Sequence, residues 1–201
     1  MNEPEPLTGE PLALDLLNTL PHPPPGGAPV DHLADAAGLL SWLALEAGRL
    51  PGAAEGEEAA GPADLAAVQA VRAHAADAVG RARNGERPPD SALHGLNEAQ
   101  LAAPAVRYAE WDGGQVVATV RRSGPLGVRT AAALAEAVVG LLADPVIGTV
   151  RECEADDCTL LFVPANPRRR WCSAARCGNR ARVARYYRRH KEGQAAPQQD
   201  A

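Results

Sequence analysis

The chain has 201 residues and a formal net charge of −5, a length that suits one domain with a hydrophobic core and a smaller attached module. Its first ten residues, MNEPEPLTGE, are acidic and contain proline, whereas a secretory signal has a basic and then an apolar region. We therefore expect a cytoplasmic protein. The longest nearly apolar stretch, residues 131–143, contains Glu136 and is shorter than the about 20 residues needed to cross a bilayer, so we predict no membrane span and no membrane partner.

Basic residues are concentrated near the C-terminal end of this acidic chain. Residues 1–150 contain 9 basic and 19 acidic side chains, whereas residues 168–191 contain 10 basic and none acidic. Arginine supplies 19 of the 20 basic residues, which indicates a codon bias, but a uniform bias would not confine the positive charge to one segment. The distribution predicts an acidic body that carries a tail facing a polyanion.

Helical periodicity dominates the first 145 residues. Apolar residues at spacings of three and four predict helices over residues 33–49, 65–82, 89–102 and 129–143. The stretch LALDLLNTL, residues 12–20, fits helical spacing and strand alternation about equally, and we prefer the helix. Residues 51–63 contain no bulky apolar residue and are expected to form a flexible connection.

The third of these helices should begin at a cap formed by Asp90 or Ser91. Its expected inward residues are Leu93, Leu96 and Leu101. Apolar residues then alternate on both sides of the run Asp112-Gly113-Gly114, which predicts a β-hairpin. The fold class expected for the body is therefore mainly α (α+β). We divide the chain into a helical domain at 1–148, a small module at 149–192 and a disordered tail at 193–201.

All four cysteines fall within 25 residues, in the arrangement Cys153-x4-Cys158-x13-Cys172-x4-Cys177. Disulfides do not persist in a reducing cytosol, and two close pairs with a hairpin-sized spacer suit a tetrahedral zinc site with four thiolate ligands. The alternatives are ordinary buried thiols, a redox pair and an iron-sulfur cluster, and the clustering and spacing favour zinc. A module of about 40 residues buries too little apolar surface to fold alone, so we expect one structural zinc ion per chain.

Between the cysteine pairs, residues 160–163 are apolar and predict a strand, residues 164–167 predict a turn, and Arg170-Trp171 predicts the returning strand. Beyond Cys177 the spacing predicts an amphipathic helix over residues 178–190. Its apolar residues are Val183, Tyr186 and Tyr187, and its basic stripe comprises Arg182, Arg185 and Arg189.

We expect the apolar face of this helix to pack on the zinc hairpin, with Trp171 and Tyr186 serving in packing rather than as stacking platforms for bases. No acidic residue accompanies the basic stripe or the run Arg168-Arg169-Arg170. Because guanidinium groups suit phosphate, the pattern favours nucleic-acid contact over a merely solvated arginine surface.

The stretch WCSAARCGNRARV resembles the CGNR zinc finger, which is named for the run Cys177-Gly178-Asn179-Arg180. LALDLLNTL resembles the opening motif of the ABATE domain, which commonly precedes that finger in stress-induced bacterial transcription regulators. The resemblance covers nearly the whole chain. It implies that the four cysteines bind zinc in a treble-clef-like hairpin and helix, and that the finger binds DNA. Gly178 would allow close approach of the backbone, whereas Asn179 and Arg180 would either serve DNA contact or brace the zinc site.

The leading hypothesis is a transcription regulator whose helical domain senses a signal or sets the oligomeric state. Its expected DNA-contacting residues are Arg168, Arg169, Arg170, Asn179, Arg180, Arg182, Arg185 and Arg189. The alternative is a zinc-stabilised module that binds an acidic protein or RNA without sequence-specific DNA binding. The sequence names no small-molecule signal and leaves a homo-oligomer open.

Enzymatic activity is not expected, because the five histidines are scattered and no glycine-rich phosphate loop is present. Asp15 and Asn18 are candidates for lining a ligand pocket. We prefer the interpretation that these two polar residues brace the first predicted helix, at residues 12–20.

Overall fold

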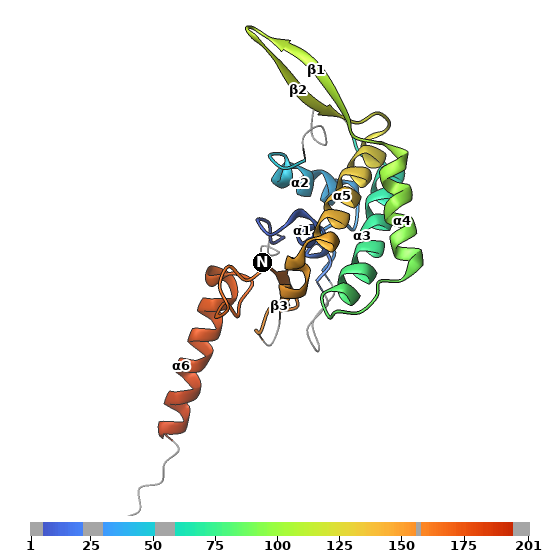
Figure 1. Ribbon diagram of the computed structural model, residues 1–201. Helices are drawn as coiled ribbons and strands as arrows, with labels where there is room; N and C mark the ends of the chain where they lie inside the picture. Colours follow the sequence, from blue (N-terminus) through green and yellow to red (C-terminus); the bar gives the residue numbers. More distant parts are fainter. Residues whose placement is uncertain (1–5, 22–29, 51–58, 156–157, 195–201) are drawn as a thin grey trace, which may run out of the picture.

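The structure, a computed structural model, describes residues 6–21, 30–50, 59–155 and 158–194 (Figure 1). The helical body contains α1 (Leu12–Leu17), α2 (Ala36–Glu46), α3 (Pro62–Ala82), α4 (Asp90–Ala102), the hairpin β1 (Val106–Asp112) and β2 (Gln115–Arg121), and α5 (Leu126–Ala143). The 3₁₀-helix η1 (Pro145–Thr149) leads into the C-terminal module, which contains β3 (Arg151–Glu152), β4 (Leu161–Phe162), the π-helical turn η2 (Ala174–Gly178) and α6 (Asn179–Gln194). The mainly helical α+β fold class is confirmed.

The predicted helices are present, with shifted ends that have local causes. The first segment is helical, as preferred. α2 begins at Ala36 because the Asp35 side chain accepts a hydrogen bond from Gly38 N at 2.8 Å and caps the helix. α3 begins at Pro62, inside the segment expected to be flexible, because proline suits the first helical turn. Residues 51–58 of that segment lie outside the described residues.

α4 has the predicted extent, but two details of its prediction are wrong. No side chain caps its N-terminus, where Pro89 takes the cap position and Asp90 is the first helical residue. Leu96 is buried as expected, whereas Leu101 is 68 % exposed because it lies in the last turn of the helix, which leads away from the core toward the hairpin.

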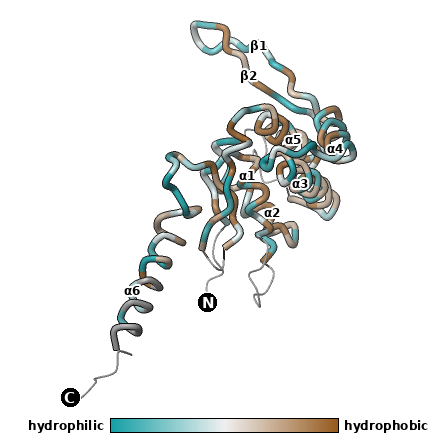
Figure 2. Tube along the Cα trace, turned by 60° about the horizontal axis from the view of Figure 1, so that its bottom comes forward, coloured by the Kyte–Doolittle hydropathy of each residue, from teal (hydrophilic) through white to brown (hydrophobic). Residues whose placement is uncertain are grey.

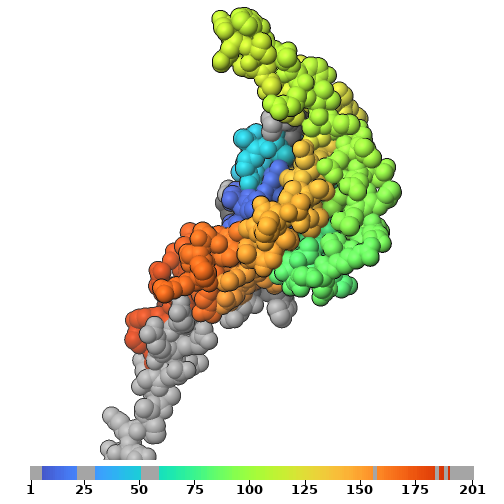
Figure 3. Space-filling model, viewed as in Figure 1, coloured from blue at the N-terminus to red at the C-terminus, as the bar shows by residue number. Residues whose placement is uncertain are grey.

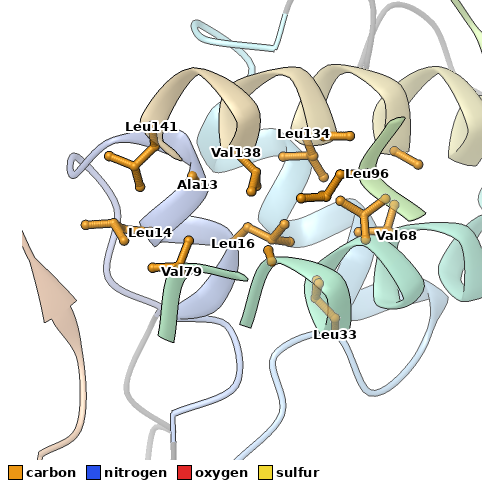
Figure 4. Close-up of a cluster of buried hydrophobic side chains, with 14 of the residues drawn as sticks. Ala13, Leu14, Leu16, Leu33, Val68, Val79, Leu96, Leu134, Val138 and Leu141 are labelled. Atoms are coloured by element: carbon orange, nitrogen blue, oxygen red, sulfur yellow. The ribbon is translucent and has the colours of Figure 1, made fainter. Parts of the chain in front are cut away.

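The body has one hydrophobic core, in which α5 packs against α1, α3 and α4 (Figure 4). Leu16 of α1, Val68 of α3, Leu96 of α4 and Leu134 of α5 are each fully buried in it. The first turns of α3 and α5 approach so closely that a Cβ on Gly127 would lie 2.2 Å from Asp64 Cα. Asp64 Oδ1 accepts a hydrogen bond from Gly127 N at 2.7 Å across this contact, so only glycine fits there.

α5 is the one helix in the described part of the chain that is long and apolar enough to cross a membrane by length and composition alone. It begins at Leu126 rather than at Arg129, so the apolar segment is longer than the sequence indicated. Its apolar residues face α1, α3 and α4 in the core, and half of the helix is buried inside the protein.

The hairpin and the C-terminal module lie at opposite ends of the molecule (Figures 1 and 3). The predicted hairpin forms with a two-residue turn, in the register Asp112↔Gln115. In the C-terminal module, residues 161–162 pair with 151–152 and not with Arg170-Trp171 as expected. The chain at Arg170 instead accepts a backbone hydrogen bond beyond the paired residues, from Glu154 N to Arg170 O at 3.0 Å.

Candidate metal centre and basic surface

The four cysteine sulfur atoms converge on one point in the C-terminal module. All four Sγ atoms lie within 4.8 Å of one another, with 3.8 Å between Cys158 and Cys172 and 3.5 Å between Cys172 and Cys177. A tetrahedral zinc ion with Zn–S bonds of about 2.3 Å requires sulfur atoms about 3.8 Å apart. The donor set and its spacing therefore fit one zinc ion held by four protein ligands, which leaves no coordination position for a substrate.

Two tight backbone turns place these sulfur atoms. In the first, the β3–β4 hairpin closes with a hydrogen bond from Cys153 N to Leu160 O at 2.9 Å. In the second, Ser173 Oγ accepts a hydrogen bond from Arg176 N at 2.9 Å and begins η2, which carries Cys177. Cys172 N donates to Cys153 Sγ at 3.3 Å and joins the two turns. Each close cysteine pair thus wraps around the same site.

The electrostatics of the cluster also call for a cation. The hydrogen bond from the Cys158 thiol lowers the pKa of Cys153 to about 2, and the same contact raises the pKa of Cys158 to about 12. The contact with Cys153 also raises the pKa of Cys172. Neighbouring thiolates repel one another, so four of them can coexist at this distance only when a cation such as Zn²⁺ compensates their charge.

The CGNR run supports the metal site from one side. A Cβ on Gly178 would lie 3.0 Å from Trp171 Cδ1, so the glycine allows the indole to close over the turn. Trp171 packs against the small cluster around the cysteines, as expected for a packing residue. Arg180 Nη2 donates to Cys177 Sγ at 3.3 Å, which is the contact expected of a residue that braces a thiolate ligand.

Arg169 points into the protein, although the sequence placed it among the DNA-contacting arginines. Its guanidinium lies 4.4 Å from the centre of the Phe162 ring. It donates hydrogen bonds to Glu10 Oε1 at 2.6 Å and to the carbonyl oxygens of Val163, Trp171 and Cys172. Arg169 thus connects the zinc module, close to the ligand Cys172, with the N-terminal segment of the body.

Glu10, which the sequence did not mark, is the centre of this junction. Its second carboxylate oxygen, Oε2, accepts a hydrogen bond from Val163 N at 2.9 Å, and only 9 % of the residue is exposed. Nothing in the local sequence could identify it, because its two partners lie more than 150 residues further along the chain.

Asn18 and Asp15, the two candidates for a ligand pocket, lie in the same junction. Asn18 binds both backbone groups of Leu161, accepting from its N at 2.8 Å and donating to its O at 3.0 Å, as a neighbouring strand would. Asp15 is fully buried, accepts hydrogen bonds from the Gly9 and Glu10 N–H groups, and pairs with Arg49. These contacts correspond to the bracing interpretation of the pair.

Burial raises the pKa of Asp15 to about 6, although the Arg49 guanidinium and the Gly9 N–H favour the charged carboxylate. Neither Asp15 nor Asn18 lines the pocket of about 350 Å³ beside α2 or the pocket of about 260 Å³ between α3 and the C-terminal module. Their hydrogen-bonding groups are used inside the protein.

The remaining arginines of the basic segment differ in what they contact. Arg168 is exposed and makes no side-chain hydrogen bond or ion pair with the residues that the structure describes. Arg170 pairs with Glu154 and stacks 4.9 Å from the Trp171 ring. Arg182 is exposed and donates to Asn179 Oδ1 at 3.2 Å. Arg185 and Arg189 belong to α6, but their side chains lie outside the described part of the structure.

α6 extends away from the metal centre, contrary to the expectation that its apolar face packs on the zinc hairpin (Figure 1). Val183, Tyr186 and Tyr187 are 53 %, 55 % and 67 % exposed, so Tyr186 is not a packing residue. The only other element that α6 contacts is η2, among the described residues, because the helix runs straight on from the last turn around the zinc site.

Comparison with protein families identifies both parts of the chain. The family model ABATE, whose description reads "Putative stress-induced transcription regulator", matches residues 10–145, and the CGNR zinc finger matches residues 149–190. No curated protein matches the chain significantly. Both matched families are regulatory or binding modules and not enzymes.

Proposed function

Because the chain belongs to the ABATE family and carries a CGNR zinc finger, we propose that it is a transcription regulator whose C-terminal module binds DNA. In this proposal residues 1–148 form the regulatory domain, residues 149–192 form the DNA-binding module, and the protein acts in the cytoplasm. The observation that carries the proposal is the basic helix α6, which projects from the metal centre with no acidic residue between positions 168 and 191.

The metal centre fixes the orientation of the basic helix. A zinc ion with four thiolates has a net charge of about −2, and the ten basic residues of the segment leave the module positive. A flexible chain of the same composition would bind any polyanion, whereas a helix that leaves a cross-linked turn presents its arginines at set intervals along a groove. Arg168 and Arg182 are the described residues best placed for phosphate contact, because both are exposed near the zinc site.

Genome-wide DNA selection with zinc-loaded protein tests the proposal, followed by fluorescence anisotropy on the recovered duplex at about 0.15 M salt. We expect the double variant Arg168→Glu, Arg182→Glu to bind at least about tenfold more weakly, because it loses two phosphate contacts and adds two repulsive charges. The slope of log K against log salt concentration should decrease by about two. Zinc content and helicity should stay at the parent's values.

The double variant Arg81→Glu, Arg87→Glu is the matched control. It makes the same change in net charge on exposed residues of the body, 62 % and 80 % exposed, and should bind DNA as the parent does. Equal DNA binding by the parent and by the Arg168→Glu, Arg182→Glu variant would refute the proposed DNA surface. Selective binding of an RNA hairpin or of poly-glutamate, with no preference among duplexes, would instead establish the RNA or protein interaction module.

A further inference from the structure

The β1–β2 hairpin, which we call the arm, is held together by the pairing of its own two strands. The two strands pair over seven residue pairs and contact no other helix or strand of the described chain. The arm extends beyond the ends of α4 and α5 into solvent (Figures 1 and 3). A two-stranded hairpin alone is marginally stable in water, so an arm of this length requires some further contact to hold its shape.

On one face of the arm, the polar side chains bind one another. Residues directly opposite in an antiparallel pair share a face, which places Tyr108, Glu110, Thr119 and Arg121 together with two valines, Val106 and Val117. Arg121 pairs with Glu110 and lies 5.4 Å from the centre of the Tyr108 ring, and Thr119 Oγ1 donates to Glu110 at 3.0 Å. This polar network needs no partner.

The opposite face, which we call the arm face, is mostly apolar and exposed to solvent. Figure 2 shows that hydrophobic residues occur along both strands of the arm, which stands away from the helices. It consists of the pairs Arg107–Val120, Ala109–Ala118 and Trp111–Val116. Trp111, Val116 and Val120 are 71 %, 67 % and 53 % exposed. Arg107 forms no hydrogen bond or ion pair with any side chain that the structure describes. Exposed apolar surface of this kind marks an interaction site.

We propose that the arm face binds the arm face of a second copy of this chain, related by a two-fold axis. The order of its pairs is what singles out this partner. The small pair Ala109–Ala118 lies at the centre, with a valine beside a larger side chain on either side. When two arms lie antiparallel with their alanine pairs in contact, Trp111 of each copy covers Arg107 of the other.

This arrangement pairs unlike groups at each end. The Trp111 indole offers its electron-rich face to a guanidinium that has no other partner among the described residues, which is a cation–π contact. Val116 and Val120 pack together across the axis, and the alanines allow the two sheets to approach closely. Each strand is about 24 Å long, so two arm faces bury only a small area against each other. Protein interfaces of small area are typically weak and dissociate reversibly.

Sedimentation velocity of the zinc-loaded full-length protein, between about 1 and 200 µM, tests the proposal. We expect a concentration-dependent monomer–dimer equilibrium. Trp111→Arg should increase the dissociation constant at least about tenfold, because it removes the indole and faces one guanidinium with another. The exchange variant, Trp111→Arg with Arg107→Trp, should recover most of the dimer, since position 111 still meets position 107 with the partners reversed.

Tyr108→Arg is the matched control, because it places the same charge on the other face of the arm and should leave dimerisation unchanged. Circular dichroism and the unfolding of the body check that the variants remain folded. A parent that stays monomeric up to about 200 µM would overturn the proposal. So would a dimer that survives Trp111→Arg, which would indicate pairing through a strand edge or another surface, or an exchange variant that stays monomeric.

Discussion

The helical body and the zinc module stabilise their folds by different means. The body buries leucine, valine and alanine side chains from α1 to α5 in a single cluster. Three of the five buried residues in the cluster of the zinc module are cysteines. The five are Cys153, Leu160, Phe162, Cys172 and Cys177. The centre of the zinc module is thus formed mostly by metal ligands, whereas the centre of the body is formed by apolar side chains. Removal of one ligand should therefore damage the module far more than removal of one apolar side chain damages the body.

The largest effect is expected from Cys172→Ser. This change removes a ligand that also contacts two other cysteine sulfurs, and structural zinc sites contribute about 10–16 kcal/mol to folding. We expect loss of the zinc ion, measured by atomic emission, and rapid proteolysis after residue 149, while the cooperative unfolding of the body persists. Ser173→Ala, a neighbouring change that removes only a capping hydroxyl, should retain zinc. A body that unfolds together with the module in Cys172→Ser would show that the two regions form one cooperative unit.

A smaller effect, confined to the other region, is expected from Leu134→Ala. Leu134 is fully buried in the middle of α5, and its truncation should lower the free energy of unfolding of the body by about 3–5 kcal/mol. Urea denaturation followed by circular dichroism measures this change. The zinc content of the native protein should remain one ion per chain. A parallel fall in zinc content would contradict the separation of the two clusters.

The smallest effect, about 1–3 kcal/mol, is expected from Glu10→Ala, which acts on the junction between the regions. The variant leaves the Arg169 guanidinium and the Val163 N–H without their carboxylate partner. Amide hydrogen exchange at Val163 should therefore become faster before the rest of the module is affected. Glu154→Ala is the matched control, because it removes the exposed partner of Arg170 and should change stability by less than about 1 kcal/mol. Unchanged exchange at Val163 would show that the junction does not restrain the module.

The sequence predicted the elements that depend on local pattern. The helices follow from apolar spacing, the hairpin from its turn residues, and the metal centre from the confinement of four cysteines to a short segment. The helix starts were less accurate, because a cap such as Asp35 or a proline such as Pro62 shifts the boundary without changing the period.

The junction and the direction of α6 could not be predicted in the same way. In a run of three arginines nothing local distinguishes Arg169, which turns inward, from Arg168, which faces solvent. Its partner Glu10 is brought near only by the complete fold. For α6, the spacing of Val183, Tyr186 and Tyr187 correctly predicted a common helix face but contained no information on whether another element covers it. Periodicity defines a face, and tertiary contacts decide its surroundings.

The base of the arm has a consequence for how this protein can change over evolutionary time. Arg122 Nη1 donates to Ala103 O at 2.6 Å, so the chain enters and leaves the arm at neighbouring points. The polypeptide between them can be shortened, lengthened or exchanged for a tight turn while α4 and α5 keep their places in the core. Evolution could therefore change the length and sequence of the arm without altering the residues that build the core or bind the metal.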